Sequence, residues 1–253
     1  MKTNSQQHHR CAWSLKSPLM MEYHDHEWGV PVRDDTILFE FLVLESAQAG
    51  LSWQTVLQKR DAYRKAFDQF DPKKVACYGE KEVGRLVTNP GIIRNRLKIL
   101  AAITNAKVFL ELQREHGSFS NYIWEFVHCQ TINHKIKNAK MFFCTSKESE
   151  LMSCELRRRG FTFVGSKICY SFMQAVGMVN DHEIGCFRHH EVMDSPKNSY
   201  AKNLTIDERK ADEGKAEASS GGWGGIRTLG ADQGTHAFQA SAFDHSATHP
   251  YNL

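Results

Sequence analysis

Two pairs of metal-binding residue types lie far apart in this sequence. Cys11 and His24 form the first pair, and His182 and Cys186 form the second. Thiolates and imidazoles are the donors that zinc takes in four-coordinate structural sites. If the four side chains meet, a single zinc ion would join the beginning of a domain to its end. The alternative is buried thiols and surface imidazoles, which the spacing alone does not exclude.

One acidic residue, Glu45, lies inside the apolar stretch FLVLESAQAGLSW. A carboxylate in such a place must be hydrogen-bonded or have a shifted pKa, because burying it without compensation costs free energy. Trp53 follows after a Gly-Leu-Ser turn, and Tyr23 lies beside the first metal candidates. A carboxylate among aromatic rings suits a flat cation, since the rings stack on it and the acid complements its charge. The alternative is a structural acid that caps a helix.

The segment LVTNPGIIRNRLKI, residues 86–99, has the outline of a helix-hairpin-helix. A turn at Gly91 would expose backbone N–H groups at the start of the second helix, where a DNA phosphate can bind. Three basic residues follow the turn: Arg94, Arg96 and Lys98. Ile93 replaces the second glycine that such hairpins usually have. The alternative is an ordinary turn between two helices with a solvated basic face.

Helical periodicity and capping residues predict that the elements holding these residues are helices. Strand-like alternation is scarce, so the predicted fold class is all-α. We expect a buried helix beginning near Asp35, and a helix from Trp53 to Phe67 with a break near Asp61. The other predicted helices are a short one after Asp71-Pro72 and those over residues 80–87, 95–115, 119–127, 146–158 and 166–176.

Composition is that of an ordinary globular protein, with 41% hydrophobic and 24% charged residues among 253. No apolar run approaches the roughly 18 residues that a membrane span requires. Residues 1–10 are polar and contain no apolar signal segment, so we expect a cytoplasmic protein with no membrane partner. Its seven cysteines should then be reduced thiols or metal ligands.

The charge and composition divide the chain into three parts. Residues 203–253 contain four Lys/Arg and seven Asp/Glu, so a net charge of +3 for the chain leaves +6 for residues 1–202. A modestly basic domain is compatible with a polyanionic partner but does not require one. We expect a flexible extension over residues 1–10, one domain over 11–193 and a disordered tail over 194–253.

With these segments in place, the chain resembles the 3-methyladenine DNA glycosylase I family of bacterial, zinc-containing repair enzymes. The resemblance rests on CAW at residue 11 and on YHDHEWGVP, LESAQAGLSWQTVLQKR, FDP, GIIRNRLKI, RRGFTFVG and ICYSFMQAVGMVNDHEIGC, in that order. It implies an all-α, helix-hairpin-helix glycosylase fold in which a zinc clip joins the two ends of the domain. The tail after residue 193 has no place in the family pattern.

The resemblance also assigns roles to single residues. Cys11, His24, His182 and Cys186 match the family's zinc ligands, which implies one structural Zn²⁺. Glu45 matches the acid of its base pocket, Trp53 its stacking ring and Tyr23 a pocket tyrosine. Met20 stands where the family usually has a second tyrosine, so a hydroxyl hydrogen bond would be lost. Trp13 is a further candidate for closing the pocket, with core packing as the alternative.

The function expected from the resemblance is release of 3-methyladenine from alkylated double-stranded DNA, which leaves an abasic site. The family lacks the catalytic aspartate of related glycosylases, and no lysine is placed for Schiff-base chemistry, so we expect a monofunctional hydrolase. The enzyme should work as a monomer, and no protein partner is implied. The alternative is a non-enzymatic zinc-containing DNA-binding module, which would have no use for an acid in an aromatic pocket.

Overall fold

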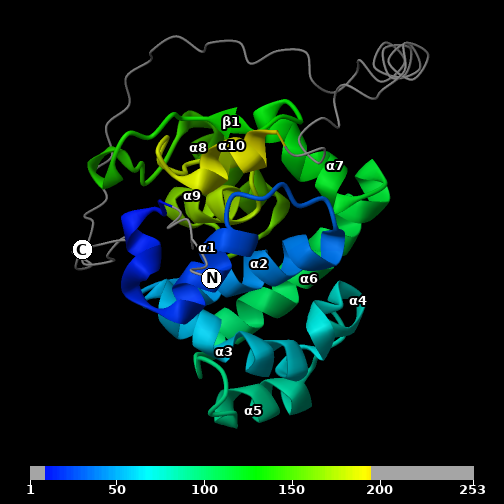
Figure 1. Cartoon of the computed structure of the whole chain (residues 1–253). Helices are drawn as coiled ribbons and strands as arrows, with labels where there is room; N and C mark the ends of the chain where they lie inside the picture. Colours follow the sequence, from blue (N-terminus) through cyan, green and yellow to red (C-terminus); the bar gives the residue numbers. More distant parts are fainter. Residues whose placement is uncertain (1–8, 195–253) are drawn as a thin grey trace, which may run out of the picture.

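The computed structural model describes residues 9–194, which form a mostly helical domain (Figure 1). The predicted tail, apart from Asp194, and most of the predicted N-terminal extension lie outside the described residues. Across residues 9–194, none of the helices combines the length and apolar character needed to cross a bilayer. The α-helices are α1 (Pro18–His26), α2 (Asp35–Gln48), α3 (Trp53–Ala66), α4 (Pro72–Val75), α5 (Glu80–Thr88), α6 (Arg96–His116), α7 (Phe119–Trp124), α8 (Lys147–Arg159), α9 (Ser166–Ala175) and α10 (Phe187–Met193).

Helix α2 is the centre of the domain. It packs against α3, α6, α7 and α9, and in Figure 1 these helices lie on different sides of it. Its residues from Leu38 to Gln48 are all buried, which explains why apolar residues occur on every side of this helix. Glu45 is therefore carried by a helix that its neighbours largely enclose.

The helix starts follow the predicted capping residues. Asp34 accepts a hydrogen bond from the backbone of Ile37, and Ser52 caps α3 in the same way. Asn95 and Ser146 cap α6 and α8 with their side chains. Short polar side chains at these positions satisfy backbone N–H groups that the helix itself leaves free. The predicted boundaries of α2, α3, α6 and α8 are thus confirmed to within a residue or two.

Four features differ from the prediction. The break near Asp61 is wrong: α3 is continuous, because Asp61 is exposed and pairs with Arg64 on the same helix. Helix α1 was not predicted. Helix α10 was not predicted either. A short parallel pair, β1 (Ile132–Asn133) and β2 (Val179–Asn180), is also present. The remaining elements are the 3₁₀ turns η1 (Ala12–Lys16), η2 (Asp68–Phe70), η3 (Glu125–Val127) and η4 (Ala139–Met141).

Candidate active site and metal cluster

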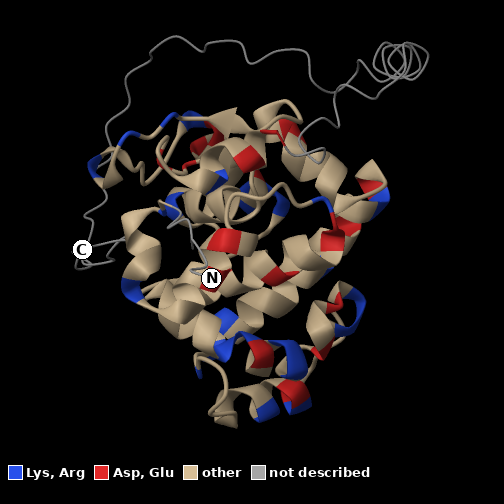
Figure 2. Cartoon of the chain, viewed as in Figure 1, with Lys and Arg blue, Asp and Glu red and all other residues tan. Residues whose placement is uncertain are grey.

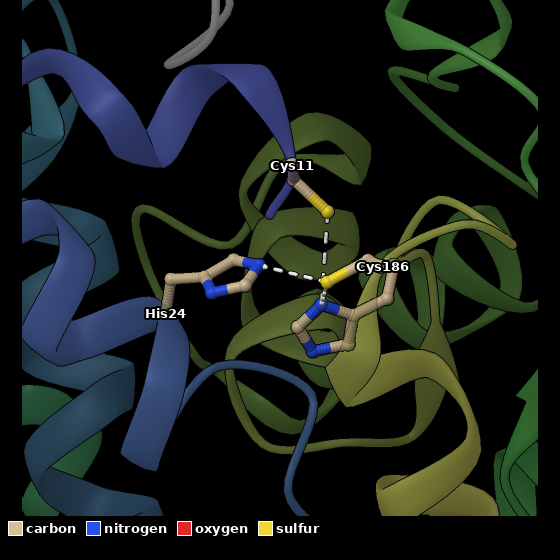
Figure 3. Close-up of side chains that lie close together, drawn as sticks. Cys11, His24 and Cys186 are labelled. Atoms are coloured by element: carbon tan, nitrogen blue, oxygen red, sulfur yellow. Dashed lines mark hydrogen bonds between the residues drawn. The ribbon is translucent and has the colours of Figure 1, made fainter. Parts of the chain in front are cut away.

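The four candidate metal ligands meet inside the domain. Cys11 precedes η1, His24 lies on α1, His182 follows β2, and Cys186 caps the start of α10. All four are at most 1% exposed, and their donor atoms lie within 4.8 Å of one another. Figure 3 shows the Cys11 sulfur atom and the His24 ring pointing at the sulfur atom of Cys186.

Three of the separations between these donor atoms fit a tetrahedral ion. Ligands about 2.0 to 2.3 Å from zinc are about 3.3 to 3.8 Å from one another in a tetrahedron. The Cys186 sulfur is 3.4 Å from His24 Nε2 and 3.7 Å from His182 Nδ1, and the Cys11 sulfur is 3.7 Å from His182 Nδ1. The donor types, the burial and the distances therefore suit a closed structural zinc site.

The electrostatics of the cluster favour a thiolate at Cys186. The hydrogen bond from the Cys11 thiol is the largest cause that lowers the pKa of the Cys186 thiol far below its ordinary value, and the His182 and His24 rings close to its sulfur lower it further. The pKa of Cys11 is raised, because it shares a proton with Cys186 and is buried. Without a cation, the two sulfurs thus behave as one thiolate and one thiol. A dication would stabilise both as thiolates.

Each imidazole has a fixed partner on the side away from the cluster. His24 Nδ1 lies 2.8 Å from Asp25 Oδ1, and the guanidinium of Arg10 donates to both oxygens of the same carboxylate at 2.8 to 3.0 Å. His182 Nε2 lies 3.0 Å from the carbonyl oxygen of Trp28. Each ring therefore places its N–H outward and its lone pair toward the sulfurs. Asp25 thus orients the His24 ring through its outer nitrogen.

A buried hydrogen-bond network holds the chain just before His182. The carboxylate of Asp181 lies 2.6 Å from His134 Nδ1 and accepts hydrogen bonds from the Tyr170 hydroxyl at 2.6 Å and from the Gln174 amide at 2.8 Å. Tyr170 is buried in the core, and its hydroxyl takes part in this network. Sequence reasoning did not find the network, because its members are up to 47 residues apart.

The predicted aromatic residues form one cluster beside the metal ligands. The rings of Tyr23 and Trp53 are 5.4 Å apart between centroids, and those of Trp13 and Tyr23 are 6.4 Å apart. Met20 lies three residues before Tyr23 on α1, hence on the same face of the helix, and is buried. The ring of Trp28 lies between this cluster and the metal ligands, with its centroid 4.9 Å from that of Trp13 and 4.6 Å from that of the His182 imidazole.

Glu45 is buried without compensation. It is 4% exposed and makes neither a hydrogen bond nor an ion pair with the residues that the structure describes, and its Oε2 atom is orphaned. Burial raises its pKa to about 8. A carboxyl group used as a structural cap would have a backbone N–H partner, so this geometry disfavours the structural alternative. The buried Nε1 of Trp53 also lacks a partner among residues 9–194.

An ion-pair network that sequence reasoning missed joins the helices carrying these residues. Arg60 on α3 is 7% exposed and donates to Glu40 on α2 at 2.6 Å and to Glu27, directly after α1, at 2.6 Å. Arg64 donates to the same Glu40 oxygen at 3.0 Å. The network fixes α1, α2 and α3 to one another. No spacing rule links charges 20 and 33 residues apart, so the sequence held no signal for it.

The predicted DNA-binding hairpin consists of α5, a turn and α6. Gly91 donates its N–H to the Asn89 side chain at 2.8 Å, and a Cβ at Gly91 would lie 2.9 Å from Ala62 Cβ, so glycine is needed there for close packing. Arg96 pairs with both carboxylate oxygens of Glu80 at 3.0 Å. Arg94 is exposed and has neither a hydrogen bond nor an ion pair within residues 9–194.

Lys98, the third basic residue of the hairpin, turns toward the protein. Its ammonium group donates to the carbonyl oxygens of Ala47 at 2.8 Å and Ala49 at 2.6 Å. Figure 2 shows basic and acidic residues interleaved over α3, α4 and α5, so the positive charge of the domain does not form one uniform patch there. Arg94 is the hairpin residue best placed to meet a phosphate.

Comparison with known proteins identifies the family. A model of methyladenine glycosylases matches residues 13–189, and the chain belongs to this family. It is 49% identical over 177 residues to DNA-3-methyladenine glycosylase 1 of Escherichia coli (strain K12), an alignment that covers 70% of this chain and 95% of that protein.

Solved structures of related proteins share the fold. A crystal structure of 3-methyladenine DNA glycosylase I matches with a TM-score of 0.69 and 47% identity, over 71% of this chain and 98% of the other. A single-residue variant of a 3-methyladenine DNA glycosylase I, solved in complex with 3-methyladenine, matches with a TM-score of 0.67 and 34% identity, over 75% of this chain and 97% of the other.

Proposed function

We propose that this chain hydrolyses the N-glycosidic bond of 3-methyladenine in alkylated double-stranded DNA, which releases the free base and leaves an abasic site. The observation that carries this proposal is the buried, unpartnered carboxyl group of Glu45 in a member of the methyladenine glycosylase family. Such a group is costly in a folded protein unless a ligand compensates it. A cationic base is the ligand that would do so.

The chemistry of the lesion explains why an acid is useful. Methylation at N3 gives the adenine in DNA a positive charge, which weakens the glycosidic bond because the base leaves as a neutral molecule. A base within a duplex is inaccessible, so the lesion must first rotate out of the helix into a pocket. The leaving group is already activated, and no strong general base is required for its departure.

Glu45 distinguishes the lesion from normal bases in this proposal. With a pKa of about 8, its carboxyl group is mostly protonated at neutral pH in the free protein. A cationic base beside it stabilises the ionised form, whereas neutral adenine cannot. Trp53 and Tyr23 supply aromatic faces on which the base stacks, and these faces bind any base. The charge therefore supplies the selectivity and the rings supply affinity.

We further propose that Cys11, His24, His182 and Cys186 hold one zinc ion with a structural role. Four protein donors leave no open position for water, so zinc would contribute folding free energy rather than a nucleophile. The inward lone pairs of His24 and His182 support this proposal. A zinc clip of this kind would join the start of the domain to its end.

DNA binding is assigned to the hairpin of α5 and α6, which we propose is a helix-hairpin-helix. Its turn lies directly before the N-terminus of α6, where backbone N–H groups and the helix dipole favour an anion. Arg94 adds an exposed charge. A hairpin of this kind contacts the phosphate backbone, so it would hold any duplex while the lesion pocket supplies selectivity.

Incubation of the protein with methylated duplex DNA, followed by chromatography of the released bases, tests the proposal. We expect free 3-methyladenine and intact, abasic strands. Glu45→Gln keeps the shape but removes the charge, and a charge-assisted hydrogen bond contributes roughly 1.5–3 kcal/mol, so excision should fall about ten- to a hundredfold. Glu111→Gln, an exposed residue on α6, is the matched control. A protein that bound methylated DNA without releasing any base would instead be the non-enzymatic module.

A further inference from the structure

The side chain of Lys98 connects the hairpin of α5 and α6 to the C-terminal end of α2. Lys98 lies in the first turn of α6, directly after the hairpin, and its own backbone N–H is capped by Asn95. Its ammonium group reaches across to the C-terminal end of α2, where it donates to Ala47 and Ala49. Glu45 lies two residues before Ala47, and Trp53 follows Ala49 by four.

The charge of Lys98 is poorly placed for its own helix and well placed for α2. A cation at a helix N-terminus opposes the helix dipole, whereas a cation at a C-terminus is stabilised by it. The last turn of α2 contains no basic residue, so the cation that complements its C-terminal carbonyl groups comes from α6. Two N–H donors of the ammonium group are thereby occupied within the protein.

The segment that Lys98 holds is short and has few other restraints. Helix α2 ends at Gln48, Gly50 has a positive φ of +80°, and α3 begins at Trp53. The backbone of Leu51 donates to Gln48 at 2.7 Å, which closes the turn. Lys98 makes no ion pair with a carboxylate of the described chain, and burial lowers its pKa. Carbonyl dipoles, rather than a counter-charge, hold the ammonium group.

We infer that Lys98 is a positioning residue that fixes the segment between Glu45 and Trp53, rather than a phosphate contact of the hairpin. This inference rests on the proposed function, because it assigns Lys98 a role in the same base pocket. Lys98 would thereby link the start of α6, which follows the DNA-binding turn, directly to the segment between Glu45 and Trp53. Loss of the ammonium group should loosen the pocket while leaving DNA binding intact.

Lys98→Met tests this inference, because methionine keeps an aliphatic stem without the charge. We expect single-turnover excision at saturating enzyme to fall about tenfold, and the affinity for free 3-methyladenine, followed by tryptophan fluorescence, to weaken several-fold. The affinity for undamaged duplex and its dependence on salt should stay within twofold of the wild type. Lys107→Met, an exposed lysine on the same helix, is the matched control and should change none of these quantities.

A phosphate-binding lysine would behave in the opposite way. Lys98→Met would then weaken duplex binding and flatten its salt dependence, as Arg94→Met should, while binding of the free base stayed unchanged; that result would overturn the inference. If Lys98→Met does not fold, Lys98→Arg decides. Arginine keeps the charge but replaces a compact ammonium with a planar fork, so reduced free-base affinity supports the inference and wild-type affinity overturns it. A wild-type protein that released no base would refute the proposed function instead.

Discussion

The carboxyl group of Glu45 and the indole of Trp53 stand at the two ends of the short connection between α2 and α3, and each has a buried polar atom without a partner among residues 9–194. Buried polar groups in a well-packed domain are nearly always hydrogen-bonded, so these two atoms call for an explanation. Both would gain from a polar, flat ligand. Their shared lack of partners is consistent with the base site proposed above.

Glu45 should make the stability of the free protein depend on pH. Its pKa is about 8 in the folded state against an ordinary value of 4.5, so the folded protein keeps this proton where the unfolded chain loses it. The free energy of unfolding should therefore fall as pH rises from about 4.5 to 8. Glu45→Gln removes the effect, so its stability gain over wild type should grow from near zero at pH 4.5 to about 3–5 kcal/mol at pH 8. Urea denaturation at both pH values measures this, and an equal difference at both would contradict it.

Asp25→Asn should weaken metal binding without removing a ligand. The carboxylate holds His24 Nδ1 and is itself held by Arg10, and loss of such an outer partner typically costs about 10- to 100-fold in metal affinity. Competition with a chromophoric zinc chelator measures the change. Asp61→Asn, which alters an exposed acid on α3, is the control. Equal zinc affinity in the two variants would show that Asp25 serves only the ion pair with Arg10.

Arg94→Ala and Arg96→Ala should differ in their effect on DNA binding. Arg94 is exposed and can contact a phosphate, whereas the guanidinium of Arg96 already forms an ion pair with Glu80. Removing one cation that neutralises a phosphate reduces the slope of log affinity against log salt by about 0.9, so Arg94→Ala should change the slope by about that amount and Arg96→Ala by less. Each variant should weaken binding by the same factor whatever the sequence of the duplex. Titrations at several salt concentrations test this, and an unchanged slope for Arg94→Ala would place the DNA-binding face elsewhere.

Arg60→Met should destabilise the domain strongly. It would leave Glu40 buried without its main partner, and breaking one side of a buried ion pair typically costs about 3–5 kcal/mol. The double variant Arg60→Met/Glu40→Leu should recover part of this loss, because it removes both charges. Chemical denaturation of the two variants gives the comparison. If the double variant were less stable than the single one, packing rather than charge would explain the role of Arg60.

The sequence predicted the larger helices because their start signals are local. Asp34, Ser52, Asn95 and Ser146 each precede an apolar repeat and each caps a helix in the structure. Helix α1 was missed because its residues contribute to the site and do not form a simple apolar stripe. The pair Ser17-Pro18, a cap followed by a first-turn proline, was the signal that could have revealed it. Strands β1 and β2 contain two residues each, which is too few for an alternating pattern of apolar and polar residues to be recognised.

The site was predictable to the extent that its residues have characteristic types. The structure brings the four metal candidates together and clusters Trp13, Tyr23 and Trp53. The partners of these residues were not predictable, since Arg10 with Asp25, Arg60 with Glu40, and Tyr170 with Asp181 meet only through tertiary packing. Lys98 illustrates the limit: its position in a basic hairpin indicated a phosphate contact, but its ammonium group binds carbonyl oxygens of another helix.

The distance in sequence between the two halves of the metal cluster has a consequence for synthesis on the ribosome. Cys11 and His24 leave the ribosome long before His182 and Cys186, and domains generally fold as units once their parts are available. Two donors hold a dication far more weakly than four, so the early segment gains little from metal on its own. Only a chain translated beyond residue 186 can close the cluster. Metal retention would thus report that translation of the whole domain had finished, and prematurely terminated chains would be left with an open, unstable end.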